Sequence, residues 1–178
     1  MINLKKRSSY FFTWHKHMRP RCSVWPVRLA SIALLAGCGP VLAAPSTFGT
    51  VVGNAILCLD QVDIAYFHAY LSASFGPAYK HEGGAWWFTV DANLWGIGIT
   101  DVLVGDDSSN TGFVAAVADA APDKLDEAIV AATGLHHVKA DASAFPLRRS
   151  GPGSKIVYFN SQSKIYCDRY QTLAPGSR

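Results

Sequence analysis

The sequence has no apolar run long enough to cross a membrane as a helix. Its most apolar stretch, residues 29–44, has 16 residues and is interrupted by Gly39-Pro40, whereas a membrane-spanning helix needs about 20. Basic residues precede this stretch and small residues follow it, which is the order of a secretion signal. We therefore expect residues 1–44 to be an export leader rather than a retained anchor, and the mature chain to work in the periplasm or cell envelope.

An excess of positive charge is missing beyond the leader. Of the 16 Lys and Arg residues in the chain, 7 precede residue 45, whereas all 13 Asp and Glu residues follow it. Residues 45–178 therefore carry 9 basic and 13 acidic side chains, a net charge of −4. Such a domain lacks the basic stripe that neutralises phosphates or anionic lipid, which argues against nucleic-acid binding.

The motifs of common enzyme sites are missing as well. The chain contains no Gly-x-Ser-x-Gly elbow, no Cys-x-x-Cys pair, no phosphate-binding loop and no His-x-x-x-His spacing. His136 and His137 are adjacent, so in a strand they point to opposite faces and cannot easily share one metal ion. We expect no cofactor, no metal and no catalytic set.

The alternative to that expectation is an enzyme whose site forms only in the fold. It would be a small envelope hydrolase or metal-dependent enzyme that combines His81, Asp101 and either His136 or His137.

The leader allows two cleavage sites. Leu35-Ala36-Gly37-Cys38 resembles the lipobox of bacterial lipoproteins, which implies acylation of Cys38 and a membrane tether. A cut near Ala43 or Ala44 would instead release a soluble periplasmic protein. Because signals usually begin close to their apolar run, we also expect Met18 rather than Met1 to be the true start.

Four cysteines are present, and two of them, Cys22 and Cys38, belong to the leader. The remaining pair, Cys58 and Cys167, is an even number in an oxidising compartment, where thiols form disulfides. We predict a Cys58–Cys167 disulfide between the two ends of the folded region, with two buried free thiols as the alternative.

Residues 45–178 have the length of one domain, and their periodicity predicts an α+β fold, a mostly antiparallel sheet with two helices packed on one face. The helices are expected over residues 64–75, where Asp60 or Asp63 can act as the cap, and over 122–133. The order of elements indicates a loose duplication of a helix plus three strands. Strands are expected at 50–57, 79–82, 85–90, 95–104 (with a bulge at Thr100-Asp101), 113–118, 136–140, 145–149, 156–160 and 165–170.

Aromatic residues form the most informative set in this domain. In a strand, Trp86 and Phe88 share one face and Trp87 takes the other. If the helices cover the Trp86 side, Trp87 is left on an open face, where it could stack on a sugar ring or on a partner's apolar side chain. If both faces are covered, which is the simpler interpretation, all three are plain core residues. The candidate binding set consists of Trp87, Trp95, Tyr66 and Tyr70.

Three functional hypotheses follow from these observations. The first is a small exported, non-catalytic envelope module that binds another envelope component or a glycan through an aromatic sheet face. The second is the small enzyme already described. The third is a periplasmic inhibitor or immunity-type protein that presents an acidic loop, residues 106–110, to an exported enzyme.

Overall fold

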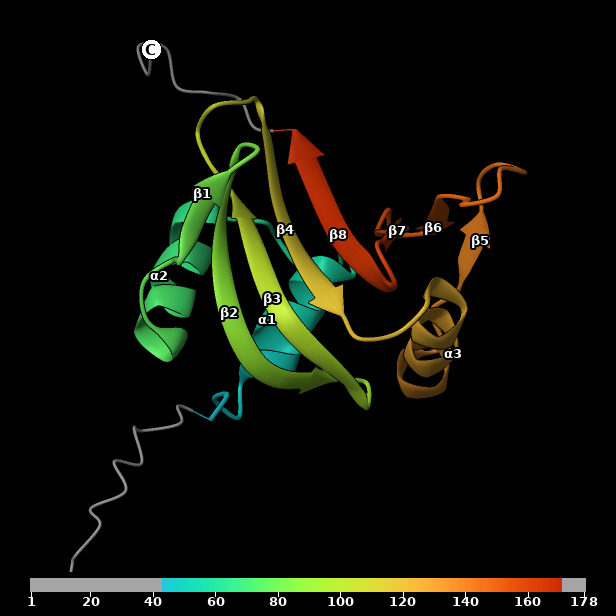
Figure 1. Ribbon diagram of the computed structural model, residues 1–178, viewed down its shortest axis with the longest axis horizontal. Helices are drawn as coiled ribbons and strands as arrows, with labels where there is room; N and C mark the ends of the chain where they lie inside the picture. The colour runs from blue at the N-terminus through green and yellow to red at the C-terminus, as the bar shows by residue number, and fades with distance from the viewer. Residues whose placement is uncertain (1–42, 171–178) are drawn as a thin grey trace, which may run out of the picture. The chain divides into compact units, whose positions relative to one another are not determined.

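The fold is described by a computed structural model in which residues 43–170 are placed. The predictions on the leader, including the Met18 start and lipidation of Cys38, lie outside these residues. The elements are drawn in Figure 1. Within this range no helix is long and apolar enough to cross a membrane.

A single antiparallel sheet of eight strands forms the centre of the fold, in the order β1-β2-β3-β4-β8-β7-β6-β5 (Figure 1). This arrangement confirms the predicted α+β class. The strands are β1 (Lys80–Glu82), β2 (Ala85–Leu94), β3 (Ile97–Gly105), β4 (Thr111–Ala118), β5 (His137–Lys139), β6 (Arg148–Ser150), β7 (Lys155–Phe159) and β8 (Gln162–Tyr170).

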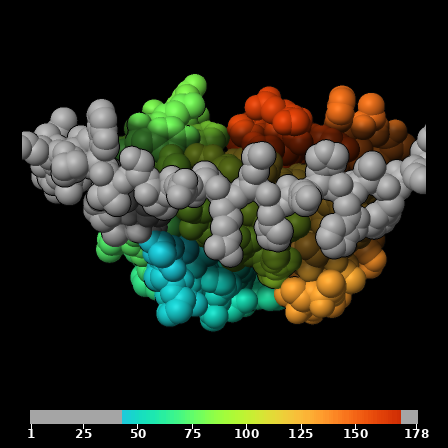
Figure 2. All heavy atoms as spheres, turned by 60° about the horizontal axis from the view of Figure 1, so that its bottom comes forward, coloured from blue at the N-terminus to red at the C-terminus, as the bar shows by residue number. Residues whose placement is uncertain are grey.

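Three helices, not two, pack on the sheet within the described part of the chain. They are α1 (Phe48–Ile56), α2 (Ile64–Phe75) and α3 (Pro122–Thr133). Buried side chains of all three belong to one core cluster with the strands, so the helices share one face, which we call the covered face. Figure 2 shows α1 (cyan) and α3 (light orange) on the same side of the molecule.

Helix α1 corrects the prediction of a strand over residues 50–57. Its apolar, β-branched residues favour a strand by composition, but Phe48, Val52, Ala55 and Ile56 are buried at the spacing of one helix face. Gly53 lies so close to the sheet that an added Cβ would stand 3.5 Å from a methyl group of Leu94. Burial against the sheet has overridden the local preference.

The other two helices follow their sequence signals. Asp63 caps α2, since its Oδ1 accepts a hydrogen bond from the backbone N–H of Tyr66 at 3.0 Å. Pro122 begins α3, and Gly134 ends it in the left-handed conformation at φ 74°. Both sets of bounds agree with the predictions.

The strands also follow the sequence, with two corrections. The first is that β2 runs on to Leu94 and β3 starts at Ile97, so Trp95, expected to start a strand, lies in the turn between them. The predicted hairpin between β1 and β2 is present, and Gly83 and Gly84 make its turn at φ 64° and 75°. The predicted bulge is present where the register of β3 shifts near Thr100. Residues 145–149 were expected to be a strand, but β6 starts at Arg148, because Phe145 lies in an exposed loop, 70 % accessible.

The chain order shows a duplication that is larger than predicted. Helix α2 is followed by β1–β4, and α3 is followed by β5–β8, so each unit has a helix and four strands rather than three. The two units meet where β4 pairs with β8. The short edge strands β1 and β5 therefore lie at opposite ends of the sheet.

The predicted disulfide is present. Cys58, just after α1, is bonded to Cys167 on β8, with the two Cα atoms 5.3 Å apart. Both cysteines are buried in the core of the covered face. The bond therefore ties the start of the α1–α2 connection to the centre of the sheet.

Candidate functional site

The second face of the sheet carries no helix among residues 43–170, and we call it the open face. Alternation along the strands places one smaller cluster on it, whose buried floor consists of Ala85, Leu103, Ala115 and Val117. Four aromatic side chains pack around this floor: Trp87, Phe113, Phe159 and Tyr166. They are half-buried rather than buried, so each one keeps surface available to a partner.

Three of these side chains, Trp87, Phe113 and Tyr166, line a groove with a volume of about 500 Å³, which we call the aromatic groove, and Phe159 lies beside Trp87. Its lining includes Trp87, Leu103, Phe113, Ala115, Lys164 and Tyr166. A volume of this size is typical of sites that hold a small ligand or a few side chains of a partner. The small alanines of the floor create the depth, because the neighbouring aromatic rings rise above them.

Lysine ammonium groups stand over the aromatic rings of this groove. Lys164 Nζ lies 4.9 Å from the ring centre of Trp87 and 4.2 Å from that of Phe159. Lys80 Nζ also lies 4.9 Å from the centre of Trp87. These distances are those of cation–π interactions. The Trp87 ring is fixed further because its Nε1 donates a hydrogen bond to the carbonyl oxygen of Glu82.

The predicted aromatic set is divided between the two faces. Only Trp87 lies on the open face. Trp95 forms the turn after β2 at φ 55° and packs against the core near α1. Tyr66 and Tyr70 stack on each other on α2, with ring centres 6.2 Å apart. These three side chains are therefore not brought together with Trp87.

Three groove residues were missed by the sequence analysis, Phe113, Lys164 and Tyr166, as was Phe159, which packs against the same cluster. A signal for Lys164 and Tyr166 exists, because buried Ile165 and Cys167 alternate with them along β8. That alternation shows that Lys164 and Tyr166 share one face of β8, but it does not show which strands lie beside β8.

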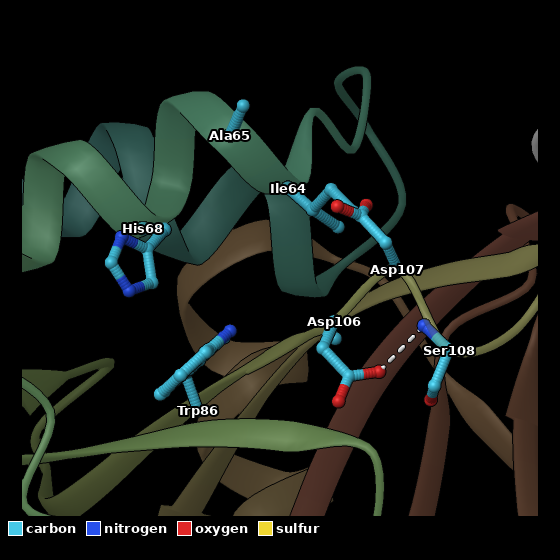
Figure 3. Close-up of a pocket in the computed structure, with 8 residues that line it drawn as sticks. Ile64, Ala65, His68, Trp86, Asp106, Asp107 and Ser108 are labelled. Atoms are coloured by element: carbon cyan, nitrogen blue, oxygen red, sulfur yellow. Dashed lines mark hydrogen bonds between the residues drawn. The ribbon is translucent and has the colours of Figure 1, made fainter. Parts of the chain in front are cut away.

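A second hollow lies at the edge of the covered face, between α2 and the β3–β4 connection (Figure 3). His68, Trp86 and Asp106 are among its lining residues, and its volume is about 510 Å³. His81 stacks on Trp86 with ring centres 3.8 Å apart, and its Nε2 lies 2.6 Å from Asp106 Oδ2. Hydrogen bonds from Ser108, and then from His81, hold the pKa of the Asp106 carboxyl below its ordinary value. The Asp106 carboxylate, one of the two in this loop, is thus engaged within the chain.

The histidines and aspartate of the enzyme hypothesis are not assembled within one copy of the chain. His81 is on β1 and His137 on β5, at opposite edges of the eight-stranded sheet. Strands are spaced about 4.8 Å apart, so about 34 Å across the sheet separates the two edge strands. Asp101 accepts a hydrogen bond from Tyr79 at 2.9 Å, and burial together with this bond raises the pKa of Tyr79 to about 12.

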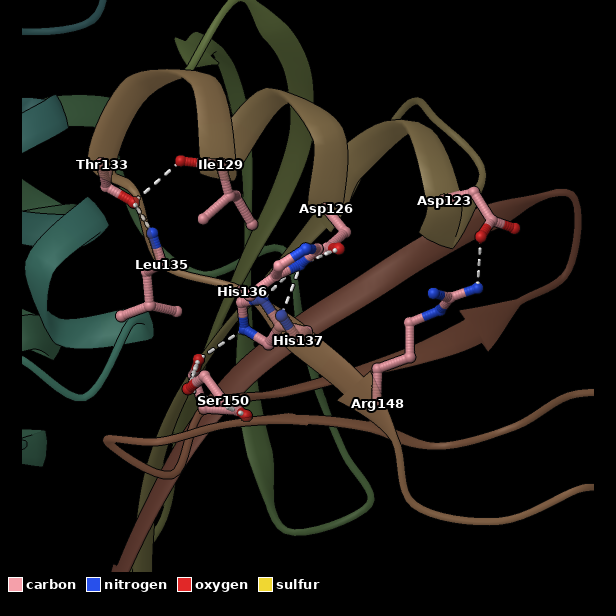
Figure 4. Close-up of polar contacts among 10 residues, drawn as sticks. Asp123, Asp126, Ile129, Thr133, Leu135, His136, His137, Arg148 and Ser150 are labelled. Atoms are coloured by element: carbon pink, nitrogen blue, oxygen red, sulfur yellow. Dashed lines mark hydrogen bonds and ion pairs between the residues drawn. The ribbon is translucent and has the colours of Figure 1, made fainter.

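A different set, Asp126, His137 and Ser154, has the connectivity of a hydrolytic triad (Figure 4). Asp126 Oδ1 lies 3.1 Å from His137 Nδ1, and His137 Nε2 lies 2.7 Å from Ser154 Oγ. The same Oδ1 accepts the backbone N–H of His137, and Ser150 Oγ lies 2.8 Å from Ser154 Oγ. His136 reaches the other oxygen of Asp126 at 2.9 Å.

Burial decides what this network can do. Ser154 is 0 % and His137 2 % exposed, so no substrate reaches the serine oxygen. Burial lowers the pKa of His137 despite the neighbouring carboxylate of Asp126. The neutral ring donates from one nitrogen and accepts at the other, which satisfies both buried partners. The network therefore joins α3, β5 and the β6–β7 turn and has no exposed nucleophile.

No group of three or more His, Cys, Asp and Glu side chains able to hold a metal ion is found in the described part of the chain. No family of known proteins, no curated protein and no solved structure matches this sequence or fold.

Proposed function

We propose that this chain is a small exported, non-catalytic envelope module that binds another envelope component or glycan through the aromatic groove. The observation that carries the proposal is the placement of Trp87. It lies half-buried on a sheet face that none of the described helices covers, among three further aromatic rings and above a buried aliphatic floor that includes two alanines. Aromatic residues in such positions dominate binding energies at interfaces because they bury much area and lose little conformational entropy.

The hydrogen-bond pattern supports binding over catalysis. The one set with triad connectivity, Asp126–His137–Ser154, is enclosed by α3 and the β6–β7 turn, and its serine has no accessible surface. On the open face, Asp101 is hydrogen-bonded to Tyr79 and Thr100. The groove offers apolar area and the cation of Lys164, and its two carboxylates, Glu82 and Asp168, are each paired with a lysine. This lining supports binding more than it supports a nucleophile with a base beside it.

Photo-crosslinking from the open face tests this proposal. A benzoylphenylalanine placed at exposed Thr89, two residues along β2 from Trp87, faces the same side of the sheet. Irradiation of cells that make this variant should give a discrete adduct in the envelope fraction. Substitution of Trp87→Ala in the same background should remove at least about nine-tenths of the adduct, as expected for loss of a central aromatic contact.

Tyr66→Ala is the matched control. Tyr66 is an aromatic residue that is 51 % exposed, but it lies on α2, on the other side of the sheet. The adduct should persist in this variant. An adduct that survives Trp87→Ala, or no adduct from Thr89 at all, contradicts the proposal; co-sedimentation with purified cell-wall glycan distinguishes a glycan from a protein.

A further inference from the structure

Lys164 is the unusual residue of the aromatic groove. Its side chain starts on β8 and reaches the ring of Trp87 on β2, across β3 and β4. The floor residues between these strands, Leu103 and Ala115, are buried, so the lysine and the tryptophan meet above them. The ammonium group is thereby held between the rings of Trp87 and Phe159.

The charge of Lys164 has no carboxylate partner among residues 43–170, in contrast to its neighbours. Lys155 Nζ lies 2.7 Å from Asp168 Oδ1, and Lys80 forms an ion pair with Glu82. Partial burial, and then the charge of Lys80, lower the pKa of Lys164. A carboxylate brought to Nζ would offset both effects, since a nearby opposite charge favours the protonated amine.

The surroundings of Trp87 favour a carboxylate over a sugar ring. Both Lys80 and Lys164 stand over its ring, so its π surface is already in contact with cations. Two carboxylates of this chain line the groove, Glu82 and Asp168, and each is already paired with a lysine, Lys80 and Lys155 respectively. The Trp87 Nε1 donates to a backbone carbonyl. These polar groups are therefore engaged and less available to sugar hydroxyls. The open face spans five strands from β2 to β7, a width of about 19 Å. That width suits the patch of about 800 Å² that a protein partner buries.

We propose that the partner is a protein that inserts an acidic side chain, flanked by an apolar one, into the aromatic groove, so that its carboxylate pairs with Lys164. This inference rests on the proposed function and names the partner chemistry. The apolar neighbour of the acidic residue packs against Phe113 and Tyr166, while the carboxylate meets the cation between Trp87 and Phe159. Truncation of one member of a desolvated charge pair weakens binding strongly, because the other charge is left unpaired.

Carbodiimide crosslinking tests the carboxylate directly, because it joins an amine to a carboxyl group only when the two are in contact. Envelopes from cells that make the protein are treated with a water-soluble carbodiimide, and the adducts are mapped by peptide mass spectrometry. We expect Lys164 Nζ in an amide bond to an Asp or Glu of one other protein. Lys139, exposed at the far edge strand β5, is the matched control and should show only background adducts.

Charge variants in the Thr89 photo-crosslinking background give the second measurement. Lys164→Gln should lower the yield of the photo-adduct at least about tenfold, as expected for an uncompensated buried charge in the partner. Lys164→Arg, which keeps the charge, should retain most of the yield. Lys139→Gln should leave it unchanged.

The outcomes separate this inference from the proposed function. A photo-adduct that needs Trp87 but survives Lys164→Gln overturns the inference and leaves the proposed function standing. Glu82 and Asp168 line the same groove, so an adduct of Lys164 within one copy of the chain shows that no partner carboxylate occupies it. An adduct that joins two copies of the chain shows a second copy as the occupant, and one to a glycan carboxylate shows a saccharide. Each of these results overturns the inference. The same holds if Lys164 reacts no more than Lys139.

Discussion

Phe88 and Trp87 are neighbours on β2, yet they have opposite environments. Phe88 is 1 % exposed on the covered face, where helices and strands enclose it. Trp87 is half-buried on the open face, where two lysine ammonium groups and the Phe159 ring surround it. One face of the sheet is thus closed by secondary structure, and the other only by its own long side chains.

The polar groups of the two faces differ in the same way. On the covered face, Asp126, His137 and Ser154 satisfy one another in a continuous network. On the open face, Lys164 has rings on its sides but no anion within the described residues. A buried network in which every polar group is hydrogen-bonded stabilises a fold. A cation in an apolar groove is instead stabilised when a partner supplies the anion.

The disulfide gives the strongest test of the covered face. Replacing both cysteines, Cys58→Ala with Cys167→Ala, should lower the free energy of unfolding by up to about 4–5 kcal/mol, since the bond closes a long loop of the unfolded chain. Chemical denaturation monitored by tryptophan fluorescence measures the change, and the wild type in reductant should show a similar loss. A loss below about 1 kcal/mol would show that the disulfide contributes little to the free energy of unfolding.

Truncating the two neighbours of β2 compares the faces directly. Phe88→Ala should destabilise by about 3–5 kcal/mol because it leaves a cavity in the enclosed core. Trp87→Ala should cost only about 1–2 kcal/mol, because its ring is partly in water. If the two variants lose equal unfolding free energy in urea denaturation, Trp87 on the open face is as fully enclosed as Phe88 on the covered face.

The buried network predicts a smaller loss. Ser154→Ala should destabilise by about 1–3 kcal/mol, since the acceptor nitrogen of His137 and the Ser150 hydroxyl each lose a partner. Ser161→Ala, in the exposed β7–β8 turn, is the control and should change stability by less than about 0.5 kcal/mol. An unchanged midpoint for Ser154→Ala would show that the network adds nothing to stability.

The same network should make stability depend on pH. Burial lowers the pKa of His137 in the folded state, so the unfolded chain takes up the proton first, near the ordinary value of about 6.5. The stability from the neutral ring is therefore fully present above about pH 6.5 and is lost as the pH falls below it. Denaturation curves between about pH 7.5 and 5 measure this loss. The substitution His137→Gln should reduce the dependence of the unfolding free energy on pH. If that dependence is unchanged in the variant, it comes from other groups than His137.

The smallest effect concerns the lysines of the open face. Lys164→Gln should change the free energy of unfolding by less than about 0.5 kcal/mol, because its half-buried charge has no ion pair to lose. Lys155→Gln should cost somewhat more, up to about 1 kcal/mol, because it breaks the contact with Asp168. If Lys164→Gln is the more destabilising of the two, the charge is already satisfied in the free protein.

Local signals predicted most of the elements. Asp63, Pro122 and the Gly83-Gly84 pair act within a few residues of their own position, so their effects can be read without knowing the fold. Helix α1 was mistaken for a strand because its apolar run contains β-branched residues. A short apolar run fits either structure, and only its burial against the sheet distinguishes them.

The candidate site was predicted only in part. The sequence identified Trp87 as the residue that faces away from Phe88, because alternation along a strand is strict. It grouped Trp87 with Trp95, Tyr66 and Tyr70, which the structure places elsewhere. The neighbours that do form the groove come from β3, β4 and β8, and the register of β8 is fixed by its pairing with β4, a segment distant in sequence.

The amino-acid sequence by itself determined the α+β class, the ends of α2 and α3, the disulfide pair and the opposite faces of Trp87 and Phe88, because these depend on local conformation or on a simple count. The tertiary structure decided which sheet face is covered, that His137 and Ser154 are sealed, and that Lys164 meets Trp87. Those outcomes depend on strand order across eight strands and on which surface the helices bury, and both are set by packing between residues far apart in the chain.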